Sequence, residues 1–323
     1  QGILERKLQA LPMPDMNALA LAQRAAGEPH PWPRAWVASG RPLDHQATVR
    51  RLSEWLAAGH EVAGLGRRCG VASGSSPEGT TTLAVVAVEA LADLSPLPTR
   101  ARAGQWLAVE ARLRVRADGG RILVLGPGGA PRTLLTSFDG TTLRGRFAAE
   151  RPGAFVVQVV ADTAQGPRPV LEARVFADTE PTSEMPEATE QPTVTGTMDD
   201  AGQLASWLAM ARASVGLPPL RRDPRLDGVA RDHAARMAAT QELAHDAGDG
   251  SPTDRLRTSG LEPIASGENV VHSSSVVLAH RALWESPSHR ANILGRSFDR
   301  VGVGAVTDAR GDTWAVELFA GGL

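Results

Sequence analysis

The 323-residue sequence predicts a mixed α+β protein made of several domains. Three observations predict this class. Residues 200–323 show apolar stripes at helical spacing followed by a terminal hairpin, residues 107–116 alternate strictly between apolar and polar side chains, and an acidic segment rich in proline and threonine separates these two regions. With 42% hydrophobic residues, a chain of this length can bury two or three separate cores.

Composition and charge exclude several other classes. The formal net charge is −2, which is not the basic balance of a nucleic-acid-binding domain. The longest aliphatic run, residues 83–88, is far shorter than the roughly 20 apolar residues of a membrane-spanning helix, so we expect no transmembrane segment. Cys69 is the sole cysteine, which excludes an intrachain disulfide. The chain starts at Gln1 instead of methionine, as expected after removal of an export signal or after trimming.

The first two segments are expected to be an α+β domain, residues 1–99, and a β-sandwich, residues 100–177. In the first, residues 50–58 predict a short helix and residues 70–88 a hairpin. In the second, about seven short apolar runs are separated by Gly- and Pro-rich turns at regular spacing, which is typical of an immunoglobulin-like sandwich. This central region has no cluster of titratable residues, and its expected role is that of a spacer or adhesion module.

Residues 178–199 are predicted to be an extended linker. Seven acidic residues and no lysine or arginine lie between residues 175 and 211, and prolines and threonines punctuate the segment. Such a stretch repels itself and forms no apolar face.

Residues 200–323 are predicted to form a layered α+β domain. An apolar stripe through Leu204 and Trp207 predicts the first helix. Asp223 followed by proline predicts the start of the second, and a third helix ends before Pro287. Apolar runs within residues 301–318, on either side of a polar turn, predict the final hairpin.

Two histidines and one glutamate of this last domain are the candidate site. His245 lies in a loop after a helix, Glu268 lies before a short apolar run, and His289 follows the proline that ends the third helix. Because 23 and 21 residues separate them, no local metal-binding motif is present, and only the fold can bring them together. Two neutral imidazoles are good zinc ligands, and a nearby carboxylate can orient a ligand or transfer a proton.

Several motifs, in a characteristic order, resemble the bacterial branch of the CAP superfamily, which comprises cysteine-rich secretory proteins, antigen 5 and pathogenesis-related proteins. The resemblance covers roughly residues 200–319. The motifs that carry it are Gly216-Leu217-Pro218-Pro219-Leu220, Ala230-Arg231-Asp232-His233, Leu243-Ala244-His245-Asp246, Gly267-Glu268-Asn269-Val270, Ser286-Pro287-Ser288-His289-Arg290-Ala291-Asn292-Ile293-Leu294 and Val301-Gly302-Val303-Gly304.

The resemblance implies an α-β-α sandwich with a large open cleft in which His245 and His289 face each other beside Glu268. It implies that the two histidines can bind a divalent cation. Zinc is the candidate that imidazole ligands favour, and no organic cofactor is expected. The superfamily's cluster contains a second glutamate, for which Glu285 is the nearest candidate, although it directly follows Trp284. Members of the superfamily bind sterols, lipids or metals, or have antimicrobial or disputed protease roles, so the fold does not determine the function.

Structural interpretations compete at each of these positions. His233 lies on the apolar stripe of its helix, where a hydrogen-bonded packing role is expected. His272 is expected to be solvated, with a position lining the cleft as the alternative. Glu268 has a structural alternative, in which it bonds loop amides. Ser286 and Ser288 suggest a Ser/His hydrolase, but the Gly-x-Ser-x-Gly motif is absent.

A faint echo of the C-terminal domain occurs in the first domain. Trp55 and His60 have the spacing of Trp284 and His289, and residues 69–72, like residues 301–304, open an apolar hairpin. This echo predicts that residues 1–99 contain a degenerate CAP-like half, and chance similarity explains it equally well. No Gly-Glu-Asn motif precedes His60, so this half is expected to bind no metal.

Three functional hypotheses follow. The first is an exported bacterial protein, secreted or held in the cell envelope, at the cell surface or in the periplasm. It is a non-enzymatic binding module whose His/Glu cleft holds a divalent metal or an apolar, lipid, protein or other envelope ligand. The second is a zinc-dependent, peptidase-like hydrolase in which Glu268 is the candidate catalytic base. Two good ligands instead of three disfavour it. The third is a structural surface protein with a vestigial cleft.

Overall fold

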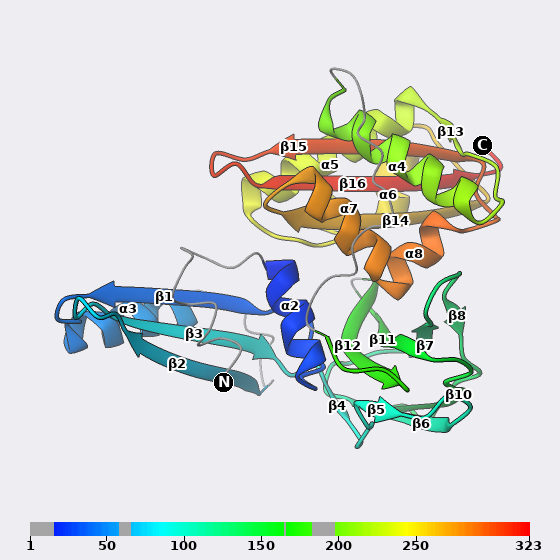
Figure 1. Cartoon of the computed structure of the whole chain (residues 1–323). Helices are drawn as coiled ribbons and strands as arrows, with labels where there is room; N and C mark the ends of the chain where they lie inside the picture. The colour runs from blue at the N-terminus through cyan, green and yellow to red at the C-terminus, as the bar shows by residue number, and fades with distance from the viewer. Residues whose placement is uncertain (1–15, 58–65, 165, 183–197) are drawn as a thin grey trace.

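The computed structural model describes residues 16–57, 66–164, 166–182 and 198–323. In these residues a three-stranded sheet, a β-sandwich and a C-terminal α-β-α domain follow one another along the chain (Figure 1). The α+β class predicted from sequence is confirmed. Within the described residues, no helix combines the length and the apolarity that crossing a membrane requires.

The N-terminal part consists of helices and one antiparallel sheet of strand order β1-β3-β2. The predicted helix is present and begins earlier than expected, and the predicted hairpin is also present. Residue His60 and most of the predicted linker lie outside the described residues. The elements are α2 (Met16–Ala25), β1 (Arg34–Gly40), α3 (His45–Ala57), β2 (Arg67–Ser75) and β3 (Thr81–Glu89).

The central part is a sandwich of two sheets around one apolar core. In β6 every second residue is buried, as its period-two sequence predicts, because alternate side chains face the opposite sheet. The sandwich begins before residue 100, since β4 already pairs with β6. One sheet holds β4 (Ala92–Leu94), β6 (Trp106–Leu113), β10 (Thr142–Ala148) and β9 (Ser137–Phe138). The other holds β5 (Arg100–Ala101), β12 (Gly166–Ala177), β11 (Gly153–Thr163), β7 (Gly119–Leu125) and β8 (Arg132–Thr133).

The C-terminal domain has helices on both faces of a sheet ordered β13-β15-β16-β14. One apolar cluster joins α4 and α7 to the sheet, and a second joins α5 and α6 to its other face, which gives three layers. The elements are α4 (Asp200–Ser214), β13 (Arg221–Arg222), α5 (Pro224–Thr240), α6 (Pro252–Thr258), β14 (Ala265–Ser273), α7 (Val276–Glu285), α8 (Pro287–Ile293), β15 (Arg300–Thr307) and β16 (Thr313–Gly321).

Helix ends follow the sequence signals, with one difference. Asp223 caps α5 with Pro224 in the first turn, as predicted, and Ser275 caps α7. Pro287 ends α7 and also begins the short helix α8. Proline is favoured in the first turn of a helix because a backbone N–H at that position has no intrahelical acceptor, so its absence from proline breaks no hydrogen bond. His289 therefore lies on a helix of its own.

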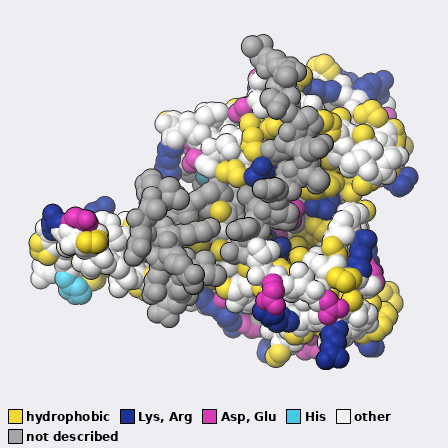
Figure 2. Space-filling view, viewed as in Figure 1, with side chains coloured by type: hydrophobic (Ala, Val, Ile, Leu, Met, Phe, Trp, Pro, Cys, Tyr) yellow, Lys and Arg dark blue, Asp and Glu magenta, His cyan; other side chains and the backbone are white. Residues whose placement is uncertain are grey.

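The sandwich and the C-terminal domain are in contact. Helix α8 packs against β7 and β11 of the sandwich, and Figure 1 shows it at the junction of the two parts. On the face shown in Figure 2, acidic and basic side chains are interspersed over the sandwich.

Candidate functional site

Three different elements supply the candidate site. His245 lies in the loop between α5 and α6, Glu268 lies on β14, and His289 lies on α8. The loop begins where α5 ends at Gln241, which has the left-handed conformation (φ 55°) that commonly closes a helix. Glu268 had been expected between a loop and an apolar run, and the structure places it within the strand itself.

His245 and Glu268 are in direct contact. Nδ1 of His245 lies 2.9 Å from Oε1 of Glu268, and the other carboxylate oxygen accepts a hydrogen bond from Arg255. The Glu268 side chain is only 2% exposed, whereas the His245 ring is partly exposed. A buried carboxylate needs such partners, because burial without them disfavours its charge. The partners of this carboxylate are the side chains of His245 and Arg255 instead of the loop amides of the structural interpretation, and these contacts are compatible with a structural role as well.

Arg255 holds the loop and the glutamate together. Its guanidinium donates to the carbonyl oxygen of His245 at 2.8 Å and also to that of Gly250. The residue lies on α6, whose first turn carries a capping box formed by Ser251 and Asp254. Sequence reasoning missed this helix, although serine followed by proline and, three residues after the serine, by aspartate is a recognisable start signal.

His233, on α5, forms hydrogen bonds to the same loop. The ring is fully buried, Nδ1 lies 2.7 Å from Oδ2 of Asp249, and Nε2 lies 3.0 Å from the carbonyl oxygen of Ala244. Both ring nitrogens are therefore occupied by protein partners. The predicted packing role is confirmed.

His289, the second predicted histidine, lies on α8. Burial of its ring, reinforced by the nearby His245, lowers the pKa of His289 to about 3. A histidine with this pKa is neutral at neutral pH, and the neutral imidazole is the form that binds metals. His245 and His289 are therefore close enough to interact electrostatically.

A buried polar network lies beneath the site. Asn269 donates from Nδ2 to the carbonyl oxygen of His289 at 3.1 Å and to Oε2 of Glu317 at 2.9 Å. Asn292 donates to Oδ1 of Asn269 at 2.9 Å. Burial raises the pKa of Glu317 to about 7. Sequence reasoning missed Glu317, although an acid inside the apolar run of residues 314–320 was a usable signal.

Glu285 lies in other surroundings. Its Oε1 is 3.5 Å from Nη2 of Arg290, and it acts electrostatically on Arg24 and Arg174 at the junction with the sandwich. Among the described residues, no hydrogen bond or ion pair joins Glu285 to His245, Glu268 or His289.

The donor atoms present are of the kind that a divalent cation takes, one ring nitrogen from each of two histidines. His245 uses Nδ1 for Glu268, which leaves Nε2, and His289 is neutral. A carboxylate on the far nitrogen of a ligating histidine is the common arrangement around metals. Among the described residues, His245, Glu268 and His289 do not form a set of three ligand atoms mutually within 4.8 Å. The remaining coordination positions would therefore belong to water or to a bound molecule.

A second group of ligand-type side chains lies at the opposite end of β14. His272, Asp308 and Asp312 each have a ligand atom within 4.8 Å of the others. The His272 ring stacks on Trp314 with ring centroids 4.0 Å apart, so its predicted solvated state is only partly realised. Asp308 already accepts hydrogen bonds from Gln241, Trp314 and two backbone amides, which leaves it little capacity for a cation.

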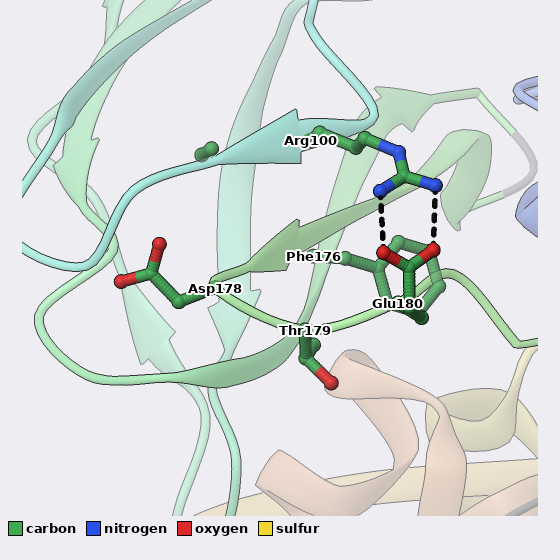
Figure 3. A pocket seen from close by; sticks show the side chains of 6 residues that line it. Arg100, Phe176, Asp178, Thr179 and Glu180 are labelled. Atoms are coloured by element: carbon green, nitrogen blue, oxygen red, sulfur yellow. Dashed lines mark hydrogen bonds and ion pairs between the residues drawn. The ribbon is translucent and has the colours of Figure 1, made fainter.

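A pocket of about 430 Å³ lies elsewhere, on the sandwich. Figure 3 shows its main feature, a pair of hydrogen bonds from Arg100 to Glu180 of 2.9 and 2.7 Å. Both side chains are exposed, so the pair contributes little energy. Arg100, Ala101, Phe176, Asp178, Thr179 and Glu180 line this pocket, and none of them belongs to the predicted site.

Comparison with known sequences identifies the C-terminal domain. Residues 208–319 match the CAP, or cysteine-rich secretory protein, family. The protein YkwD of Bacillus subtilis is 30% identical over 110 residues, which are 33% of this chain and 42% of YkwD. The chain thus matches less than half the length of this curated relative.

Similar solved structures include three from bacteria. An outer surface protein of Borrelia burgdorferi is 21% identical and covers 40% of this chain and 96% of its own, with a TM-score of 0.37. An extracellular SCP-domain protein of Bacillus anthracis is 16% identical and covers 70% and 88%, with a TM-score of 0.36. A cysteine-rich secretory protein of Staphylococcus aureus is 14% identical and covers 71% and 85%, with a TM-score of 0.33. With such scores, the family assignment rests on the sequence matches.

Proposed function

Residues 208–319 of this chain are a CAP domain, and from that premise we propose that the domain is a binding module for a divalent cation. Zinc is the first candidate for this cation. His245 and His289 are the ligands. The observation that carries the proposal is the 2.9 Å contact between Nδ1 of His245 and the buried carboxylate of Glu268. This contact orients the ring and raises the electron density on Nε2, the nitrogen left for the metal.

The same contacts favour binding over catalysis. A zinc hydrolase would need Glu268 to remove a proton from a water molecule. One oxygen of this carboxylate contacts His245 and the other accepts from Arg255, and the side chain is almost fully buried. A water molecule would have to share an oxygen that already has a protein partner, on a side chain with little solvent access, which disfavours Glu268 as the base. The bound cation would supply a Lewis-acidic point that holds a ligand group.

The ligand held beside the cation is proposed to come from the cell envelope or the exterior. The family name, cysteine-rich secretory protein, and the extracellular location stated for the Bacillus anthracis protein support an exported, secreted or envelope-associated role. Fractionation of cells that express the natural gene tests this part, and recovery in the cytoplasm alone would contradict it.

Zinc titration by calorimetry tests the metal site. We expect wild-type protein to bind one equivalent at the site, and His245→Ala or His289→Ala to weaken that binding at least tenfold, because each removes one of two protein ligands. Glu268→Gln is expected to weaken it about tenfold through the loss of the orienting charge.

His272→Ala is the matched control, since it removes a histidine from the second group of ligand-type residues. If this variant alone abolishes zinc binding, the cation belongs to the other group and the proposal fails. Turnover of peptide or ester substrates by wild type that is lost in Glu268→Gln would replace the binding module with the hydrolase.

A further inference from the structure

Helix α8, which carries His289, lacks a cap of its own. Its N-cap residue, Ser286, makes no side-chain hydrogen bond to the first-turn amides, and Pro287 occupies the first helical position. The first amides of a helix have no intrahelical acceptor and need an outside partner when buried. Ser286 is buried, so water does not readily satisfy this helix end.

The missing acceptor comes from another domain. Gln158 lies on β11 of the sandwich, is 0% exposed, and its Oε1 accepts a hydrogen bond of 2.9 Å from the backbone amide of Ser288. Its Nε2 donates to Oγ of Ser286 at 3.2 Å and to Oε1 of Glu172 at 2.6 Å. Glu172 is itself buried and paired with Arg24. Both the oxygen and the nitrogen of the Gln158 side-chain amide are therefore hydrogen-bonded to buried partners or to α8.

A second contact holds the other side of His289. Arg290 is buried, its guanidinium lies 4.0 Å from the ring centroid of Trp284, and its Nη1 is 3.5 Å from the carbonyl oxygen of Gly129 in the sandwich. The residues immediately before and after His289 are thus both tied to the sandwich. The backbone of this histidine has little freedom independent of the neighbouring domain.

We propose that Gln158 is a positioning residue for His289: it caps α8 from the β-sandwich, so that the sandwich is part of the metal-binding unit. The inference rests on the proposed function for the identity of the site. It assigns the central domain a role beyond that of a spacer. Polar side chains that are fully buried and fully bonded specify one geometry, because any displacement leaves a desolvated group without a partner.

The test uses the full chain with Gln158→Met, which keeps the length of the side chain and removes its donor and acceptor. We expect the Ser288 amide to exchange hydrogen faster by NMR. We expect zinc affinity to fall between roughly three- and tenfold, the scale of a lost helix cap. Thr142→Val is the control, since Thr142 is a buried polar residue of the opposite sheet and its loss should change neither quantity.

The outcomes separate the two proposals. Zinc binding by wild type with unchanged affinity in Gln158→Met overturns the positioning role and leaves the metal site intact. Absence of zinc binding by wild type overturns both. If Gln158→Met does not fold, Ser286→Ala removes one of the two bonds that Gln158 makes to α8, and unaltered exchange at Ser288 with unaltered affinity in that variant overturns the inference.

Discussion

Three neighbouring strands of the C-terminal sheet have the strand order of the N-terminal sheet, and the two sheets differ in what covers them. In the N-terminal part β1 precedes α3 and pairs with β3, which pairs with β2. In the C-terminal domain β14 precedes α7 and α8 and pairs with β16, which pairs with β15. All four pairings are antiparallel. The echo in the sequence aligns residues 69–72 with residues 301–304, so β2 is the counterpart of β15 in this comparison.

The two hairpins differ in what covers them, although both carry a glycine at the matched position. A Cβ at Gly302 would lie 2.2 Å from the backbone of Leu226 on α5, and one at Gly304 would lie 2.2 Å from Arg231. A Cβ at Gly70, the counterpart of Gly302, would meet nothing within 4 Å. Glycine in β15 therefore allows a helix to touch the strand, whereas β2 is largely exposed.

Of the two sheets compared, the C-terminal one carries the buried polar network of Asn269 and Glu317. Across β14, β16 and β15, Asn269, Glu317 and Val303 lie side by side. The counterpart of Glu317 by the same register is Val85, which is paired with Trp36 and Val71. The comparison teaches that a shared strand order does not carry a site. The site needs the polar residues under it and the helices that bring Arg255 and His289 to it.

The largest effect is expected from Gly302→Ala. The added methyl would overlap the backbone of α5, so we expect a loss of at least about 3 kcal/mol of unfolding free energy, or no folded C-terminal domain. Gly70→Ala should change it by less than about 0.5 kcal/mol. Urea unfolding measures both. Equal costs at the two positions would show that the hairpins are covered alike and would break the comparison.

A pH-dependent effect is expected at Glu317. Its folded-state pKa is raised from 4.5 to about 7, so the folded protein binds the proton more tightly than the unfolded chain does. The stabilisation from the protonated acid is present below about pH 4.5 and is lost as the pH rises through 7. Glu317→Gln should therefore gain about 3 kcal/mol relative to wild type between pH 4.5 and pH 8.

The control for that measurement is Glu89→Gln in β3 of the N-terminal sheet. Unfolding free energies at several pH values give the difference from wild type directly. A difference for Glu317→Gln that stays constant from pH 4.5 to pH 8 would mean that this acid is charged in the folded protein throughout.

The smallest expected effect is the difference in unfolding free energy when valine is replaced by threonine at two matching positions, Val303 and Val71. Val303 is 1% exposed and Val71 is 55% exposed. Threonine has nearly the shape of valine, so the substitution adds only a hydroxyl, which costs about 1 kcal/mol when buried without a partner. We expect that cost for Val303→Thr and a change within about 0.5 kcal/mol for Val71→Thr. A cost at Val71 would reveal a partner that covers β2.

Local patterns in the chain predicted most elements of the fold. The period-two run in β6, the Asp223-Pro224 start of α5 and the terminal hairpin depend on neighbouring residues only, and each is present. Helix α6 and the start of the sandwich at β4 were missed because both are short and their apolar residues show no clear period. The three candidate residues His245, Glu268 and His289 were named from ordered motifs.

What the sequence determined by itself is the kind of side chain available at each point: two histidines and an acid in one domain, with glycines in the strand beside α5. Only the tertiary structure decided how they are used. It turned Glu268 toward His245 and Arg255, directed Glu285 to Arg290, and brought Gln158 from another domain to the helix of His289. The reason is physical: a hydrogen bond between residues 130 positions apart depends on packing that no local pattern encodes.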